Sequence, residues 1–325
     1  MYTVPYPTDF TGLRVIRKHG YALVRYTKPM LNPDLGVYRS VIFKGTTLVG
    51  FSPPRSTASA AWDHVGTEFI EGTMVNAFYD NGWKICTKSV IGADSAFIRG
   101  APTFEQMFYE ADAAGSMHNL DPTLAYSFVL QHPKNRIVYP VEHPKLWLIA
   151  AYRITGPTVD EVSVNTPFSR PPVVEASRVG VVYRGGAARC KVLTQEYMAA
   201  HELRGNSTSF VRHCIDLMRS GRINDFCRVF PDLEFGAFSV LRAVKKFKRD
   251  LYDEYYTEHI QRARSHRLFN RHRRALHAIY LKELRPLAIT ERVVAAYVDN
   301  LAPEVLEATI LSGPYAHLSC SFSPR

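Results

Sequence analysis

The sequence predicts an α+β protein, in which an antiparallel, strand-rich domain over residues 1–200 precedes a basic, all-helical domain over residues 201–325. Two observations predict this fold class. Fifteen of the 20 prolines and 15 of the 19 glycines lie in the first 200 residues, where they separate short stretches of alternating apolar residues. Beyond the polar stretch 201–209, apolar residues recur at i, i+3 and i+4, which is typical of amphipathic helices.

Two hairpins are expected early in the strand-rich region. Residues 39–51 alternate around a Lys44-Gly45 turn, and residues 74–88 alternate around Asn81-Gly82, the pair that supplies the two positive φ angles of a type I′ turn. The same region contains four further expected elements: a helix over 103–114 that Thr103 and Gln106 begin as a capping box, strands over 127–138 and 146–154, and a hairpin over 179–193.

The hairpin over 74–88 also predicts a surface for an anion. A two-residue turn places residue 79 opposite 84 and residue 77 opposite 86. One face then carries the core-facing side chains Met74, Phe78, Trp83 and Ile85. The other face carries Val75, Ala77, Tyr79, Lys84, Cys86 and Lys88. We expect the second face to form the floor of an anion site; the alternative is an ordinary exposed face with two lysines.

The helical region carries most of the net charge. Its expected helical segments cover 210–218, 223–230, 238–284 with at least one break, and 291–311. The chain has 40 Lys and Arg against 30 Asp and Glu, and 13 of these basic side chains but only five acidic ones lie between 242 and 285. There Arg267, Arg271 and Arg274 follow at i, i+4 and i+7, a stripe suited to successive phosphates of a nucleic acid. The alternative is a solvated helix face balanced by nearby acids.

Several classes of protein are disfavoured by the sequence. The longest apolar run, 146–152, is far shorter than the roughly 20 residues of a membrane span. The N-terminus lacks the pattern of a secretory signal, and the five cysteines form no Cys-x-x-Cys pair. The 12 histidines show no metal-ligand spacing with them. We therefore expect a cytoplasmic protein with free thiols, no membrane contact and no metal site.

Several short segments also occur in an order that resembles a known family. They are 39–43 (RSVIF), 68–76 (EFIEGTMVN), 79–89 (YDNGWKICTKS), 127–138 (SFVLQHPKNRIV), 179–182 (VGVV) and 189–191 (RCK). Together they resemble the nucleotidyltransferase domain of phage-type RNA ligases, in the divergent form carried by large DNA viruses. The most specific is Pro-x-Asn-Arg-Ile-Val at 133–138, and the resemblance covers about residues 35–205. It implies an antiparallel fold of the ligase and capping-enzyme type, ATP and Mg²⁺ as cofactors, RNA as partner, and a location in host cytoplasm or virion.

The resemblance implies a site that has lost its chemistry. In that family a lysine of a Lys-x-Asp/Glu-Gly motif attacks the α-phosphate of ATP, and two glutamates hold metal and ribose. Here Glu71-Gly72 ends the motif, but Phe69 stands at the lysine position. Val129 and Val179 stand at the two glutamate positions. The residues assigned to nucleotide and phosphate binding are Arg39, Glu71, Lys84, Lys88, Arg136, Arg189 and Lys191.

These assignments favour one function over two alternatives. A phenyl ring has no lone pair with which to attack phosphorus, so we expect a ligase-like protein that binds nucleic acid or nucleotide without lysine-adenylate catalysis. The first alternative is an active ATP-dependent RNA ligase, joining 5′-phosphate and 3′-hydroxyl ends, with Lys84 or Lys88 as a displaced nucleophile. The second is a structural protein that reuses the fold as an interaction scaffold.

Overall fold

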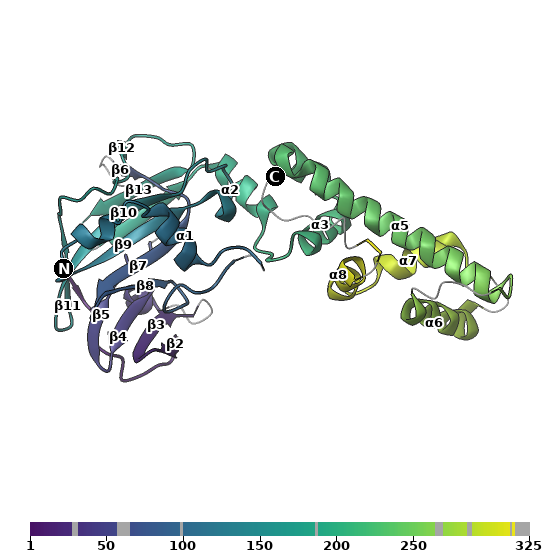
Figure 1. Cartoon of the computed structure of the whole chain (residues 1–325), viewed down its shortest axis with the longest axis horizontal. Coiled ribbons are helices and arrows are strands. Elements are labelled where there is room, and N and C mark those ends of the chain that lie inside the picture. The colour runs from purple at the N-terminus through teal and green to yellow at the C-terminus, as the bar shows by residue number, and fades with distance from the viewer. Residues whose placement is uncertain are drawn as a thin grey trace. The chain divides into compact units, whose positions relative to one another are not determined.

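The computed structural model describes residues 1–27, 32–56, 66–97, 100–185, 188–263, 269–284, 288–312 and 314–315. The chain divides into two compact units, unit 1 (Met1–Glu202) and unit 2 (Leu203–Arg325), drawn in Figure 1. Unit 1 contains antiparallel sheets, and the described part of unit 2 is helical. The predicted α+β class is therefore confirmed, while the function of each predicted domain stays a prediction.

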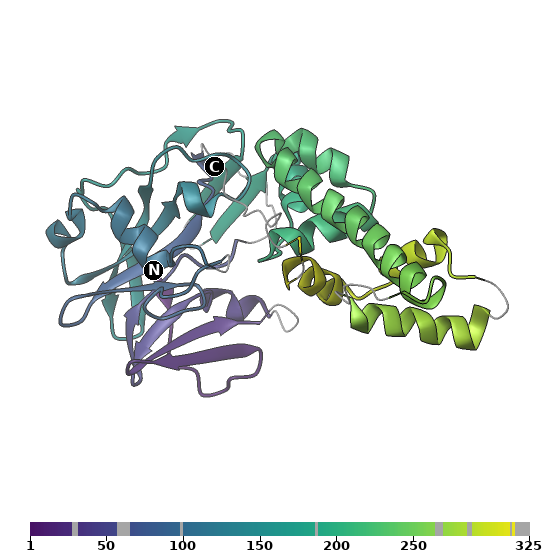
Figure 2. The ribbon, with the colours of Figure 1, turned by 45° about the vertical axis from the view of Figure 1, so that its right-hand side comes forward.

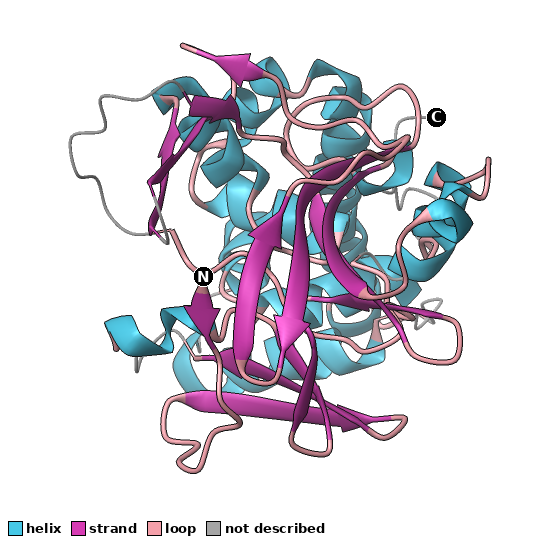
Figure 3. Cartoon of the chain, turned by 90° about the vertical axis from the view of Figure 1, so that its left-hand side faces the viewer, coloured by secondary structure: helices cyan, strands magenta, loops and turns pink. Residues whose placement is uncertain are grey.

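Unit 1 is built from three sheets whose strands pair antiparallel (Figure 3). Sheet A has the spatial order β1 (Tyr2–Thr3), β11 (Thr158–Val162), β10 (Lys145–Thr155), β9 (Leu124–Gln131), β7 (Thr73–Tyr79), β8 (Trp83–Thr87). Sheet B has the order β2 (Leu13–Lys18), β3 (Tyr21–Tyr26), β4 (Val41–Lys44), β5 (Thr47–Gly50). Sheet C has the order β12 (Val173–Val174), β6 (Gly66–Glu68), β13 (Gly180–Gly185), β14 (Ala188–Leu193).

Sheet A is buried on both faces. One face packs against helix α1 (Phe104–Ala111), where the Phe108 and Phe128 ring centroids lie 5.9 Å apart. The other face packs against sheet B, and the Phe51 and Tyr152 rings meet edge to face at 5.0 Å. Because β9 lies in the middle of this arrangement, seven of its eight residues are buried, and its sequence is almost continuously apolar.

Most expected elements of unit 1 are confirmed. Strands β4 and β5, β10 and the β13–β14 hairpin lie where the sequence predicts them. Helix α1 begins with the predicted capping box: the Thr103 hydroxyl accepts from the Gln106 amide at 3.1 Å, and the Gln106 side chain accepts from the Thr103 amide at 2.9 Å. Three 3₁₀ turns complete the described segments: Pro33–Val37, Ser116–Asn119 and Pro133–Asn135.

The predicted register of the β7–β8 hairpin is wrong by one residue. The structure pairs Tyr79 with Trp83 and Phe78 with Lys84, so the loop has three residues and not two. Such a slip moves one strand's side chains to the opposite face. Trp83 and Ile85 thus pack toward α1 with Val75 and Ala77, while Lys84 and Cys86 share the other face with Phe78. The expected anion floor that combines Lys84 with small neighbours therefore does not form.

Other differences concern strand ends and one missed hairpin. The strand expected over 127–138 ends at Gln131, because the side chain of His132 caps a 3₁₀ turn. Arg136 consequently lies outside any strand. The β2–β3 hairpin was not expected. It turns through His19-Gly20, both with positive φ, a conformation that is uncommon for histidine.

Unit 2 gathers its helices along one long helix, α5 (Figure 2). Helix α2 (Gln195–Arg204) lies mostly in unit 1 and runs into unit 2. The described elements that follow in unit 2 are α3 (Phe210–Arg219), α4 (Ile223–Val229), a 3₁₀ turn (Pro231–Leu233), α5 (Glu234–His259), α6 (Asn270–Ile279), a π-helical turn (Tyr280–Leu284), α7 (Glu291–Asp299) and α8 (Pro303–Ser312). The helices expected over 210–218 and 223–230 are confirmed. The segment over 238–284 is broken as expected, whereas the one over 291–311 is two helices, with Pro303 at the start of the second.

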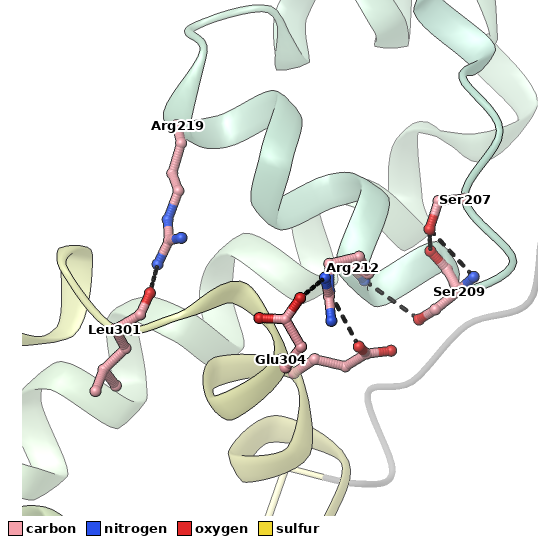
Figure 4. Close-up of polar contacts among 7 residues, drawn as sticks. Ser207, Ser209, Arg212, Arg219, Leu301 and Glu304 are labelled. Carbon is pink, nitrogen blue, oxygen red and sulfur yellow. Dashed lines mark hydrogen bonds and ion pairs between the residues drawn. The ribbon is translucent and has the colours of Figure 1, made fainter. Parts of the chain in front are cut away.

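Polar contacts fix α3 against the start of α8 (Figure 4). The Arg212 guanidinium lies 2.5 Å from a Glu304 carboxylate oxygen and 3.2 Å from a Glu307 one. Arg219 donates to the Leu301 carbonyl at 2.7 Å. No helix within the described residues is long and apolar enough to cross a membrane.

Candidate functional site

Three cations converge in unit 1: Arg39, just before β4, with Arg189 and Lys191 on β14. We call them the cationic cluster. Arg189 and Lys191 flank buried Cys190, so both project from the same face of sheet C. The charge of Arg39 lowers the pKa of Arg189 and the pKa of Lys191, so Arg39 lies near both side chains.

Burial and repulsion act together on this cluster. Burial is the largest cause that lowers the pKa of Arg189 to about 10, followed by the charges of Arg39 and Arg184. Partial burial of the amine, then Arg39 and Arg189, lower the pKa of Lys191, although this residue keeps an exposed surface. Like charges that lie close together in a partly buried place repel one another, and a bound anion would reduce that repulsion.

Arg184 places the cluster at the junction of two sheets. It pairs across the hairpin with Arg189. Its guanidinium donates to the Ile149 carbonyl at 3.2 Å and forms an ion pair with Glu161, so it joins sheet C to sheet A. The attraction of Glu161 for Arg189 is weaker than the repulsions from Arg39 and Arg184.

Lys191 lies over the ring at the position that the resemblance assigns to the nucleophile. Its Nζ is 5.0 Å from the Phe69 ring centroid. Phe69 directly follows β6, and its amide donates to the Gly180 carbonyl at 2.8 Å. A hollow of about 300 Å³ adjoins this pair and is lined by Phe69, Gly72, Ile137, Lys191, Leu193, Tyr197, Met198 and His201. One cation, two aromatic rings and apolar walls thus meet in one place.

Glu71 holds the backbone beside the hollow. Its two carboxylate oxygens accept from the amides of Val138 at 2.8 Å and Tyr139 at 3.1 Å, and the Tyr197 hydroxyl donates to it as well. Burial raises the pKa of Glu71, and these hydrogen bonds offset part of the rise. The carboxylate is therefore used to position the segment after the 3₁₀ turn.

The Pro-x-Asn-Arg-Ile-Val element is fixed around the same strand end. The Asn135 amide group donates to the Thr73 hydroxyl at 2.9 Å. The Arg136 Nε donates to the Val138 carbonyl at 2.9 Å. The most specific motif of the sequence thus has a clear role here, which is to build the wall next to Glu71.

Of the two valines at the glutamate positions, Val129 is buried and Val179 is half-buried. A Cβ on Gly72 would meet the Val129 side chain at 2.6 Å and the Leu130 carbonyl at 2.5 Å, so glycine is required there. The Val179 carbonyl accepts from the Thr194 amide at 3.0 Å. Neither valine offers a ligand atom for a metal or an acceptor for ribose.

The surrounding carboxylates do not fit the Mg²⁺ that the resemblance implies. Glu71 is held by backbone amides, and Glu68 accepts from the Ser177 hydroxyl at 2.8 Å. Among the residues that the structure describes, no three His, Cys, Asp or Glu side chains gather as a metal site. We therefore assign no step to a metal ion.

The remaining predicted lysines lie in two different places. Lys88 lies near the cluster. Its Nζ is 5.5 Å from the ring centroid of Tyr26. Burial lowers the pKa of Arg39, and the charge of the Tyr26 hydroxyl raises it. Lys84 instead lines a separate hollow of about 560 Å³ with Lys44 and Asp80, near the tip of the β7–β8 hairpin. Of the seven predicted residues, Lys84 alone lines that second hollow.

The predicted nucleic-acid stripe is only partly visible. Arg267 lies outside the described residues. Arg271 and Arg274 are exposed on α6, with buried His272 and Arg273 between them. Whether these arginines bind nucleic acid stays a prediction.

Two residues of the site were missed by the sequence reasoning. Arg184 could have been found from its cross-strand partner Arg189 once the hairpin register is known. Tyr197 carries no sequence signal, because only the fold brings α2 beside Glu71.

Comparisons with known proteins give a distant link. No protein-family model matches the chain. The chain is 28% identical over 116 residues to a protein of Rhodothermus phage RM378 described as an RNA ligase. The match covers 30% of this chain and 26% of the phage protein, so the chain spans about a quarter of that relative's length. The chain is thus distantly similar to a viral RNA ligase.

Proposed function

We propose that this protein has an RNA-ligase-like nucleotidyltransferase fold and binds a nucleotide or an RNA 5′-phosphate at the cationic cluster, without forming a lysine adenylate. The observation that carries the proposal is that Lys191, which lies over the Phe69 ring, is close enough to Arg39 and Arg189 for their charges to lower its pKa. The distant similarity to a phage RNA ligase supports it.

The chemistry of the cluster suits phosphate. Guanidinium groups bind phosphate oxygens through charged N–H donors, and the Lys191 amine adds a point charge. A phosphate group would also offset the repulsion that lowers the pKa of Arg189 and of Lys191.

The adjoining hollow suits a base. Its volume of about 300 Å³ lies at the lower end of the range of small-molecule sites. Phe69 and Tyr197 offer ring faces, and Leu193 and Met198 offer apolar walls. A nucleotide can thus place its phosphates at the cluster and its base in the hollow.

Titration calorimetry with ATP, and separately with a short 5′-phosphorylated RNA, tests this function. Arg39→Ala, Arg189→Ala and Lys191→Ala should each weaken binding about tenfold or more, which corresponds to about 1.4 kcal/mol. Arg17→Ala is the matched control, because Arg17 is an exposed cation on β2. Unchanged affinity in the three variants, or no binding of either ligand by the folded wild type, contradicts the proposal and favours the scaffold.

An active ligase is the second candidate, and the position of Lys191 favours it. The Lys191 amine faces the ring at the nucleophile position, and its pKa is lowered, as a nucleophilic lysine requires. After losing a proton to solvent, Nζ would attack the α-phosphorus of ATP. A P–N bond would form, the P–O bond to pyrophosphate would break, and pyrophosphate would leave.

Labelling decides between the two candidates. The protein is incubated with α-labelled ATP and Mg²⁺, and the covalent adenylate is measured on a denaturing gel. We expect no label. Label that persists in Lys84→Ala and Lys88→Ala but disappears in Lys191→Ala would establish the ligase with Lys191 as its nucleophile.

A further inference from the structure

One face of α5 combines cations with tyrosines. Arg242, Lys245, Arg249, Tyr252 and Tyr256 follow one another at steps of three and four residues, so they form one stripe along the helix. Four of the five are exposed and Tyr252 is half-buried. We call this stripe the α5 ladder. Away from the ladder, the helix buries its apolar side chains in unit 2: Ala237, Val240, Val244, Phe247 and Leu251.

The cations of α5 fall into two groups. Off the ladder, Lys246 pairs with Asp250 at 2.8 Å and Lys248 pairs with Asp299 at 2.7 Å. On the ladder, Lys245 and Arg249 have no acidic partner within ion-pair distance among the described residues.

At the start of the ladder, Arg242 donates to the Ser239 hydroxyl and lies 5.6 Å from the Phe235 ring centroid. Asp253 is exposed at the edge of the stripe and contributes one negative charge. The three ladder cations therefore leave a net positive surface.

Aromatic rings stand at both ends of these cations. The Tyr252 and Tyr256 ring centroids are 6.0 Å apart and their planes are inclined by 34°. Tyr256 is 41% exposed and Phe235 is 70% exposed, so both rings are accessible from solvent. Exposed rings next to cations bind unpaired bases by stacking, while the cations hold the phosphates.

We propose that the α5 ladder binds single-stranded RNA, with Arg242, Lys245 and Arg249 on the phosphates and Tyr252 and Tyr256 on the bases. This proposal rests on the proposed function and names the surface that holds the strand. A single strand fits better than a duplex because base pairs hide the ring faces that the tyrosines require.

Fluorescence anisotropy with a labelled RNA of about 20 unpaired nucleotides tests the ladder at several salt concentrations. Each phosphate contact contributes a slope of about −0.7 to log K against log salt, so replacing the three cations by glutamine should make the slope shallower by about 2. Tyr252→Ala with Tyr256→Ala should weaken binding about tenfold or more with the slope unchanged. The control, Lys246→Gln with Lys248→Gln, removes two charges from the same helix and should leave the slope unchanged.

The outcomes separate the ladder from the cluster. Circular dichroism confirms that each variant is folded. Calorimetry with ATP measures the ligand affinity that we attribute to the cationic cluster. If both ladder variants bind RNA as tightly as the wild type, the proposal that the ladder binds RNA is wrong, whether or not the protein binds ATP. RNA binding through the ladder without any ATP binding overturns the proposed nucleotide site and leaves the ladder standing. Equal affinity for duplex RNA, or equal binding to vesicles of anionic lipid, with no effect of the tyrosines, also overturns the ladder.

Discussion

The cationic cluster of unit 1 and the α5 ladder of unit 2 use the same charges in opposite ways. In the cluster, partly buried Arg39 and Arg189 meet Lys191, and their mutual repulsion is held in place by the surrounding sheets. In the ladder, cations stand in solvent along one helix. A partly buried group of like charges is suited to one specific anion, whereas an exposed row acts through many weak, salt-dependent contacts.

The largest expected effect breaks the framework of the cluster. Glu71→Ala leaves the Val138 and Tyr139 amides without their acceptor in a buried place. Each lost acceptor costs about 1–3 kcal/mol, so the free energy of unfolding of unit 1 should fall by about 3 kcal/mol. Denaturant unfolding, followed by near-UV dichroism, measures the change.

Glu71→Gln serves as its control. The amide keeps one acceptor oxygen, so this variant should lose less stability than Glu71→Ala. ATP binding should fall with unit 1 stability in Glu71→Ala, while RNA binding by the ladder stays. Equal stability of Glu71→Ala and wild type would contradict the role of this carboxylate.

The second effect separates stability from binding. Arg189→Met removes one of the repelling charges and keeps an unbranched apolar side chain, so the unfolding free energy of the ligand-free protein should change by less than about 1 kcal/mol. ATP affinity should nevertheless fall about tenfold, which is 1.4 kcal/mol. Calorimetry and thermal unfolding of the same sample measure both.

Arg249→Met is the matched ladder variant. An exposed substitution away from packed features stays within about 0.5 kcal/mol. It should leave both ATP affinity and stability unchanged. A stability loss in Arg189→Met equal to its binding loss would mean that Arg189 is simply structural.

The motif order in the sequence predicts Arg39, Arg189 and Lys191 as one group, and the structure places them close enough to act on one another, while their binding role stays a prediction. The hairpin register was missed because Asn81-Gly82 is compatible with loops of two and of three residues, and the choice depends on packing against sheet B and α1. The role of Glu71 was also hidden. Its partners lie 67 and 68 residues further along the chain, and no local pattern marks a carboxylate that holds backbone amides.

The third effect is a pH dependence of the cluster. The pKa of Arg189 is lowered to about 10, and the pKa of Lys191 is lowered as well. An anion binds the protonated forms, so ATP affinity should fall as the pH rises from 7 toward 10, and the fall should be steepest near pH 10. Calorimetry across this range measures it.

Lys191→Met is the control for the pH series. It should bind ATP more weakly at pH 7 and show a flatter decline, because one of the titrating groups is gone. An affinity that is constant between pH 7 and 10 in the wild type would contradict a contact between these cations and the ligand.

The smallest effect concerns cations that are already paired. Arg212 contacts Glu304, whose side chain is 65% exposed, and Glu307, whose side chain is 19% exposed (Figure 4). Exposed ion pairs contribute about 0–1 kcal/mol, so Arg212→Ala should lower the stability of unit 2 by about 1 kcal/mol and leave RNA affinity unchanged. Denaturant unfolding and anisotropy measure the two quantities. Arg212→Ala and Arg249→Gln could instead weaken RNA binding equally. Arginines with and without an acidic partner among the described residues would then contribute equally to RNA binding, which contradicts the proposed role of the ladder. If only the ladder variant weakens binding, the absence of an acidic partner is what makes a cation of unit 2 available to phosphate.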